Sequence, residues 1–96
     1  TATLKLAHCA QMQDSTIELN GPGGLFGLVH VHLVCAIGNT RYYENFPGGT
    51  RNEIGREIGL LNPPLPANGY VHPPKGSGWG AEWDRAYFEK KRIALL

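Results

Sequence analysis

Residues 68–84 read Asn68-Gly69-Tyr70-Val71-His72-Pro73-Pro74-Lys75-Gly76-Ser77-Gly78-Trp79-Gly80-Ala81-Glu82-Trp83-Asp84, and they are the most informative stretch of the chain. It joins a run of strand-forming side chains, Tyr70 to His72, to a turn in which every second residue is glycine. Asp84 follows the turn and can cap the N-terminus of a helix over residues 85–95. The last third of the chain is therefore predicted to form a short strand, a glycine-spaced turn and a final helix.

The strongest helix is predicted upstream, from Leu25 to Ala36, after the opening turn of residues 21–24. Its apolar residues follow the spacing of three and four that marks one helix face: Leu25, Leu28, Val29, His32, Leu33, Cys35 and Ala36. The Gly38-Asn39 pair predicts a left-handed residue at its end.

Strands are expected on both sides of this helix. Residues 2–7 alternate around Lys5 and predict a short strand that ends near His8, followed by a loop with one helical turn up to Asn20. The aromatic run Arg41 to Phe46 predicts a second strand that ends at Glu44 or Asn45. Strand, helix and strand in this order form a βαβ unit, the building block of parallel sheets.

Chain length and net charge exclude several classes of protein for this sequence. The 96 residues provide one small core, and prolines 63, 64 and 66 exclude a central strand between residues 51 and 67. A net charge of +1 provides no excess of positive charge that would attract nucleic acid or an anionic membrane. The longest apolar stretch, residues 25–37, is interrupted and shorter than the ~20 residues of a membrane span.

The cysteine content and the first residues of the sequence predict a cytoplasmic location. Cys9 and Cys35 have neither the density nor the spacing of a disulfide framework or a zinc site, so buried, reduced thiols in a cytoplasmic protein are predicted. No secretory signal is visible at the start of the sequence.

The order of these motifs resembles a known family. A helix that ends in Leu33-Val34-Cys35-Ala36-Ile37-Gly38-Asn39, an aromatic strand that ends in Glu44, a proline-rich path, Asn68-Gly69 and the glycine turn follow each other across nearly the whole chain. This succession is similar to the C-terminal segment of the mandelate racemase and muconate lactonizing enzyme branch of the enolase superfamily. Ser77 stands where that family usually has proline, and Trp79 where it has leucine.

The resemblance implies an α/β fold: the end of a (β/α) barrel, with its last strands and helix, and a C-terminal tail that belongs to the capping domain. Residues 1–50 would be the last βαβ part of a TIM-like barrel, and residues 51–96 an extension that returns to the capping domain, with no independent second core. The barrel would be incomplete. We therefore expect a homo-oligomer, or association with a missing N-terminal segment.

The resemblance also implies a function: a fragment of a magnesium-dependent isomerase or lyase that abstracts a proton α to a carboxylate, as a racemase, cycloisomerase or sugar-acid dehydratase. His8 resembles the family's catalytic histidine, and Glu44 the glutamate that donates to, or orients, the substrate carboxylate. The family's metal ligands lie on earlier strands, so this chain alone is expected to bind no Mg²⁺ and to be inactive. Its partner would be a small carboxylate or sugar-acid substrate.

Each signal also has a simpler explanation. His8 would otherwise be a loop histidine, and Glu44 a solvated charge at a strand end. His30 and His32 on a helix point in different directions, which favours packing or surface roles over a zinc site. Residues 21–24 lack the following Lys-Ser/Thr of a phosphate loop. For the whole chain, the alternative is a non-catalytic α+β module, or a truncated frame, that acts through oligomerisation.

Overall fold

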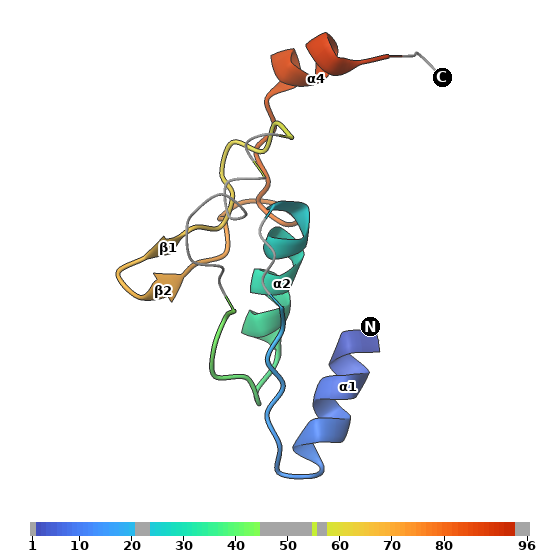
Figure 1. Cartoon of the computed structure of the whole chain (residues 1–96), viewed down its shortest axis with the longest axis vertical. Coiled ribbons are helices and arrows are strands. Elements are labelled where there is room, and N and C mark those ends of the chain that lie inside the picture. The colour runs from blue at the N-terminus through green and yellow to red at the C-terminus, as the bar shows by residue number, and fades with distance from the viewer. Residues whose placement is uncertain (1, 21–23, 45–54, 56–57, 94–96) are drawn as a thin grey trace.

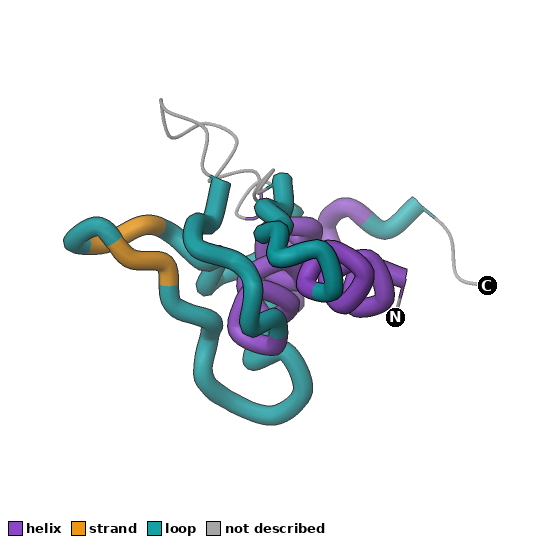
Figure 2. Tube along the Cα trace, turned by 90° about the horizontal axis from the view of Figure 1, so that it is seen from below, coloured by secondary structure: helices purple, strands orange, loops and turns teal. Residues whose placement is uncertain are grey.

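The computed structural model describes residues 2–20, 24–44, 55 and 58–93. Three helices, α1 (Ala2–Gln11), α2 (Gly24–Ala36) and α4 (Arg85–Lys91), and two strands, β1 (Pro66–Ala67) and β2 (Tyr70–Val71), are described in this part of the chain. Figure 1 shows α1 beside α2, the β1–β2 hairpin projecting from the other side, and α4 at the far end. Figure 2, seen from below, also places the hairpin and α1 on opposite sides.

The first helix, α1, occupies the residues for which the sequence predicts a strand. That prediction, over residues 2–7, is wrong. Alanine, leucine and lysine have high helix propensity, and Leu4 and Ala7, three residues apart, share one helix face. Ala7 is 1% exposed and packs in the core with Ile37, with Leu4 against them. The same apolar residues that suggested an alternating strand therefore form a narrow helical stripe.

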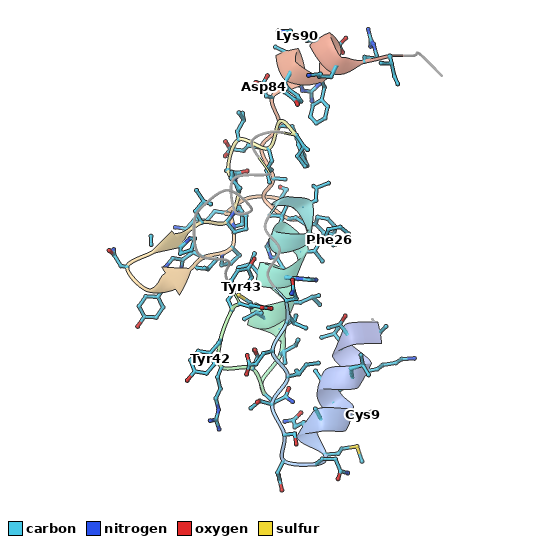
Figure 3. All side chains as sticks on the ribbon, in the orientation of Figure 1. Cys9, Phe26, Tyr42, Tyr43, Asp84 and Lys90 are labelled. Carbon is cyan, nitrogen blue, oxygen red and sulfur yellow. The ribbon has the colours of Figure 1, made fainter. Side chains whose placement is uncertain are left out.

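The second helix, α2, confirms the helix predicted at these residues. Leu28 and Val31 are almost completely buried. The helix is apolar around most of its circumference, and such helices are usually covered on all sides. Phe26 nevertheless remains 69% exposed, on the side of α2 that faces away from the hairpin (Figure 3). Part of the apolar surface of α2 is thus left uncovered by the chain.

The end of α2 differs from its prediction. The helix stops at Ala36, and neither Gly38 nor Asn39 has a positive φ, so the predicted left-handed residue is wrong. Ile37 follows directly, donates to the Val34 carbonyl at 3.4 Å and is buried. Because Ile37 is drawn into the core, the chain leaves the helix without a left-handed reversal.

Two segments without regular secondary structure flank α2, residues 15–20 and residues 39–44. The N–H of Ile17 donates to the carbonyl of Asn39 at 3.0 Å, and the Glu18 side chain contacts residues 40–42. Residue numbers rise together along both segments, so the two run in the same direction, as Figure 1 shows.

The segments thus flank α2 in the order expected of a βαβ unit, but they form no ladder. The first segment begins at Ser15, seven residues after His8, where the sequence predicts the first strand to end. Residues 41–44 form no strand, which corrects the predicted aromatic strand as far as it is described. Asn45 and Phe46 lie outside the described residues.

The hairpin confirms the short strand predicted over residues 70–72, except that it ends at Val71 and leaves out His72. Pro66 pairs with Val71 and Ala67 with Tyr70 in an antiparallel register. The connecting Asn68 and Gly69 have φ values of 52° and 80°, the left-handed pair that an Asn-Gly hairpin turn requires. Proline is tolerated in β1 because this described sheet has only two strands, so both are edges.

The glycine-spaced turn folds back onto residues 59–62. The side chain of Asn62 donates to the Gly80 carbonyl at 2.8 Å and accepts from the Glu82 N–H at 2.8 Å. A Cβ on Gly80, where φ is 65°, would lie 2.6 Å from the Pro74 carbonyl oxygen. Only glycine fits at position 80 of this turn, which explains one of the three regularly spaced glycines.

The last helix, α4, begins as the sequence predicts. Asp84 is its N-cap, and Oδ1 of Asp84 accepts from the N–H of Tyr87 at 2.9 Å. The helix ends at Lys91 rather than Leu95, because Arg92 is extended (φ −64°, ψ 123°).

The remaining expectations concern thiols and membrane spans. Cys9 and Cys35 are free but exposed, which corrects the expectation that they are buried. The buried stripe of α1 runs through Ala7 and leaves Cys9 on the outer surface. Among the described residues, no helix has the length and apolar character needed to cross a membrane.

Candidate functional site

The candidate site is centred on the two parallel segments, at the side of α2 where Glu18 meets residues 40–42. Oε2 of Glu18 accepts from the Thr40 hydroxyl and from the Tyr42 N–H, each at 3.0 Å. The Arg41 N–H is shared between Oε1 at 3.2 Å and Oε2 at 3.3 Å. The bond from the Tyr42 backbone is the largest cause that lowers the pKa of Glu18 below 4.5.

Asn39 anchors the start of the second segment. Its side-chain amide donates to the carbonyl of Ala7 at 2.9 Å and to that of Ser15 at 3.0 Å. The end of α1, the first segment and the second segment are therefore connected through one side chain. A cavity of about 280 Å³ lies beside this junction. Its lining is mostly polar: Gln11, Asp14, Ser15, Thr16, Gly38, Asn39, Thr40 and Arg41.

The first segment is described up to Asn20, and α2 begins at Gly24. The Nδ1–H of His30, on α2, donates to the Asn20 carbonyl. The Asn20 side chain is exposed and makes no hydrogen bond with another described residue. An amide side chain can donate and accept hydrogen bonds, but it does not ionise near neutral pH.

Glu44 is the last described residue of the second segment, and it is exposed. Its carboxylate has no hydrogen bond or ion pair with the described part of the chain. The residue before it is fixed, because the Tyr43 hydroxyl donates to the Gly27 carbonyl of α2 at 3.3 Å. Burial raises the pKa of Tyr43. Figure 3 shows Tyr43 against α2 and Tyr42 pointing away from it.

His8 lies inside α1, where its carbonyl accepts from Met12 N–H at 3.0 Å, and it is exposed. Cys9, its neighbour, lies on the opposite side of α2 from Tyr42 in Figure 3. No hydrogen bond or ion pair joins His8 to Glu44 among the interactions of the described residues. The structure thus does not bring the two sequence-predicted site residues together.

The histidine pair on α2 engages backbone carbonyls, as the packing or surface interpretation predicts. His30 contacts Asn20, and the His32 Nε2–H donates to the Trp79 carbonyl at 3.1 Å. Within the described ranges, no cluster of three or more His, Cys, Asp or Glu side chains is placed to hold a metal ion.

A second cavity of about 620 Å³ opens between residues 41–43 and the hairpin turn. Its volume falls in the range of small-molecule sites, and it is rich in tyrosine. The lining residues are Val34, Arg41, Tyr42, Tyr43, Asn68, Gly69, Tyr70 and Val71.

The sequence interpretation missed Glu18, Asn20 and Asn39. A signal for the first two was present, because Thr16-Ile17-Glu18-Leu19-Asn20 alternates polar and apolar residues with the period of an extended chain. Ile17 and Leu19 do pack toward the core, which leaves the polar members on the other side. Nothing local distinguishes Asn39, whose partners are remote in sequence.

Comparison with known proteins gives one match. A family described as enolase C-terminal domain-like matches residues 1–87. No curated protein and no solved structure matches the chain.

Proposed function

Because this chain belongs to the enolase C-terminal domain-like family, we propose that it is the C-terminal part of a magnesium-dependent enolase-superfamily enzyme of the racemase and muconate lactonizing branch. Such an enzyme abstracts a proton α to a carboxylate, and racemisation, cycloisomerisation and sugar-acid dehydration are the candidate outcomes. The family match over residues 1–87 is the observation that carries the proposal.

The arrangement around α2 supports a place at the end of a barrel. Residues 15–20, α2 and residues 39–44 have the order and the common direction of a βαβ unit. Parallel strands are normally paired on both sides and covered by helices. In our proposal, a neighbouring strand would pair with residues 39–44, residues 1–50 would complete the barrel, and residues 51–96 would return to the capping domain.

The exposed surface supports a missing partner. A compact monomer of 10.5 kDa exposes about 5,400 Å², whereas this chain exposes 7149 Å². The excess is about twice the ~800 Å² that each partner buries in a standard protein interface. Large apolar side chains such as Leu6 and Phe26 contribute to it. We propose that the upstream part of the same protein covers this surface; formation of a homo-oligomer is the competing outcome.

Glu44 is the residue that we propose to act on the substrate carboxylate. It follows a segment held at each of residues 40–43, and at the end of a parallel strand it would face the end of a barrel where active sites lie. A glutamate donates a hydrogen bond only when protonated, which removal from water favours. Coverage of Glu44 by the rest of the protein would supply that environment.

The base is less well defined. The resemblance places a histidine at the end of the strand before the helix, and His8 was the residue matched to it. Since His8 lies within α1, the place before α2 is held by Asn20. The resemblance predicts a catalytic role for His8, but from its position in α1 we expect that His8 does not act as the base. Asn20 can hydrogen-bond a substrate oxygen but cannot serve as a base.

The described residues do not fit a magnesium site, since they provide no cluster of three suitable ligands. We therefore assign the metal ligands to the rest of the protein, and no step performed by this chain passes through the ion. We also propose a cytoplasmic location, which the two free thiols support.

The experiment is hydrogen exchange in D₂O. The longest open reading frame that contains this sequence, and the 96-residue chain by itself, are incubated with Mg²⁺ and a panel of 2-hydroxy carboxylates and sugar acids, and loss of the α-proton is followed by NMR. We expect exchange by the longer protein only, and a roughly 10²-fold loss in Glu44→Gln. The matched control is Glu89→Gln, an exposed carboxylate on α4, with unchanged exchange.

Absence of exchange by the longer protein on every acid would favour the non-catalytic α+β module. An upstream frame without three spaced Asp or Glu residues at strand ends would also overturn the enzyme proposal.

A further inference from the structure

Glu44 depends for its position on the residues that precede it. The Glu44 side chain forms no hydrogen bond and no ion pair with described residues. Each of the four residues before it is fixed by a hydrogen bond, three of them by Glu18 and one, Tyr43, by α2. The Glu18 carboxylate is thus the principal contact that orders the approach to Glu44.

The contact also sets how the two segments align. In an extended strand the N–H groups of consecutive residues point to opposite sides, so those of Arg41 and Tyr42 would go to two different neighbouring strands. Here one carboxylate takes both, and the Thr40 hydroxyl as well. Because both N–H groups converge on one carboxylate, a shift of residues 39–44 by one residue relative to residues 15–20 would change the partners of that carboxylate, so the contact favours the observed alignment.

We propose that Glu18 is a positioning residue that fixes where Glu44 stands in the site. This inference rests on the proposed function, since it gives Glu18 a role in the same reaction. Glu18 itself does not touch substrate. It acts through the backbone of residues 40–42, and its effect on the reaction passes through the Glu44 carboxyl.

The first test measures amide hydrogen exchange by NMR in the 96-residue chain. Glu18→Gln removes the charge from the acceptor, so we expect exchange at Arg41 and Tyr42 to become roughly 2–10-fold faster, the range for loss of one net hydrogen bond. The amide of Met12, bonded to His8 in the turn after α1, should not change. Thr40→Val deletes one hydrogen-bond donor to Glu18 and keeps the shape of the side chain, so it should give a smaller increase in the two exchange rates. It also replaces Glu18→Gln as the test variant if Glu18→Gln does not fold. Unchanged rates at Arg41 and Tyr42 in both variants would overturn the inference.

The second test is a double-mutant cycle on α-proton exchange by the longer protein. If Glu18 acts through Glu44, Glu18→Gln lowers the rate about tenfold in the wild-type background and by less than twofold in the Glu44→Gln background. Equal losses in both backgrounds would mean a general structural role and would contradict the inference. Glu89→Gln is again the control.

The two tests separate the possible failures. If the longer protein exchanges no α-proton, the proposed function and the role of Glu18 in the reaction fail together. Amide rates that still respond to Glu18→Gln would then show that the contact with residues 40–42 is real and that only the reaction was assigned incorrectly.

Discussion

Asn39 and Ala7 are joined by a hydrogen bond of 2.9 Å from the Asn39 side-chain amide to the Ala7 carbonyl, although 32 residues separate them. The same amide group also donates to Ser15. These bonds hold α1 against the segments that flank α2, and without them the packing of α1 would rest on its narrow apolar stripe.

We therefore expect Asn39→Ala to destabilise the chain by about 1–2 kcal/mol, because it leaves two carbonyls without this donor in a half-buried place. Urea unfolding followed by circular dichroism would measure the loss. Asn20→Ala is a matched control, since the Asn20 side chain makes no hydrogen bond with described residues. Equal stability of the two variants would show that the Asn39 bridge is not formed in solution.

Gly80 should tolerate no side chain. Gly80→Ala combines a positive φ of 65° with a Cβ placed 2.6 Å from the Pro74 carbonyl oxygen, so we expect a loss of about 2–4 kcal/mol in the free energy of unfolding. A Cβ at Gly38 would have no other atom within 4 Å, and Gly38 has no positive φ, so Gly38→Ala should leave the free energy of unfolding nearly unchanged. A neutral Gly80→Ala would mean that the turn closes differently.

Asp84 should be required for α4. Asp84→Ala removes the acceptor of the Tyr87 N–H, and loss of such a cap costs about 1 kcal/mol, which is large for a helix of seven residues. We expect the Cα chemical shifts of residues 85–91 to move toward random-coil values, while Asp84→Asn keeps them. Shifts that stay helical in Asp84→Ala would contradict a capping role.

The Glu18 contact should depend on pH. Its pKa in the folded chain lies below 4.5, so the carboxylate stabilises the fold above that pH, and the contribution is lost as the pH falls through the lowered value. Thermal unfolding should show a higher Tm for wild type than for Glu18→Gln at pH 7, and the two curves should converge in acid. A Tm difference that persists after full protonation would assign the effect to packing instead.

His8 and Glu44 should differ in their importance for the proposed reaction. Because His8 lies in α1 rather than at the end of the segment before α2, we expect His8→Gln to leave α-proton exchange by the longer protein within threefold of wild type. Glu44→Gln should lose about 10²-fold. A loss in His8→Gln as large as that in Glu44→Gln would instead confirm His8 as the base.

Local signals were sufficient where neighbouring residues decide the structure. Asp84 accepts from a residue three positions away, so the start of α4 was predicted. Asn68-Gly69 makes a turn that its own backbone preferences favour, but only the strand that follows it was predicted, and not the hairpin. Local signals failed for residues 2–7, because the same apolar residues fit both the alternating pattern of a strand and one face of a helix. Packing of Ala7 against Ile37 decides between the two, and no local pattern contains that contact.

The helix α2 and the cap of α4 could be inferred from the sequence because each depends on residues within a few positions of one another. The family could be inferred because its motifs follow in order along nearly the whole chain. Only the tertiary structure decided that residues 15–20, and not residues 2–7, run beside residues 39–44. It also decided that Glu18 and Asn39 connect them. The physical reason is that these contacts join groups more than 20 residues apart, so each is defined only once α2 has brought the two segments together.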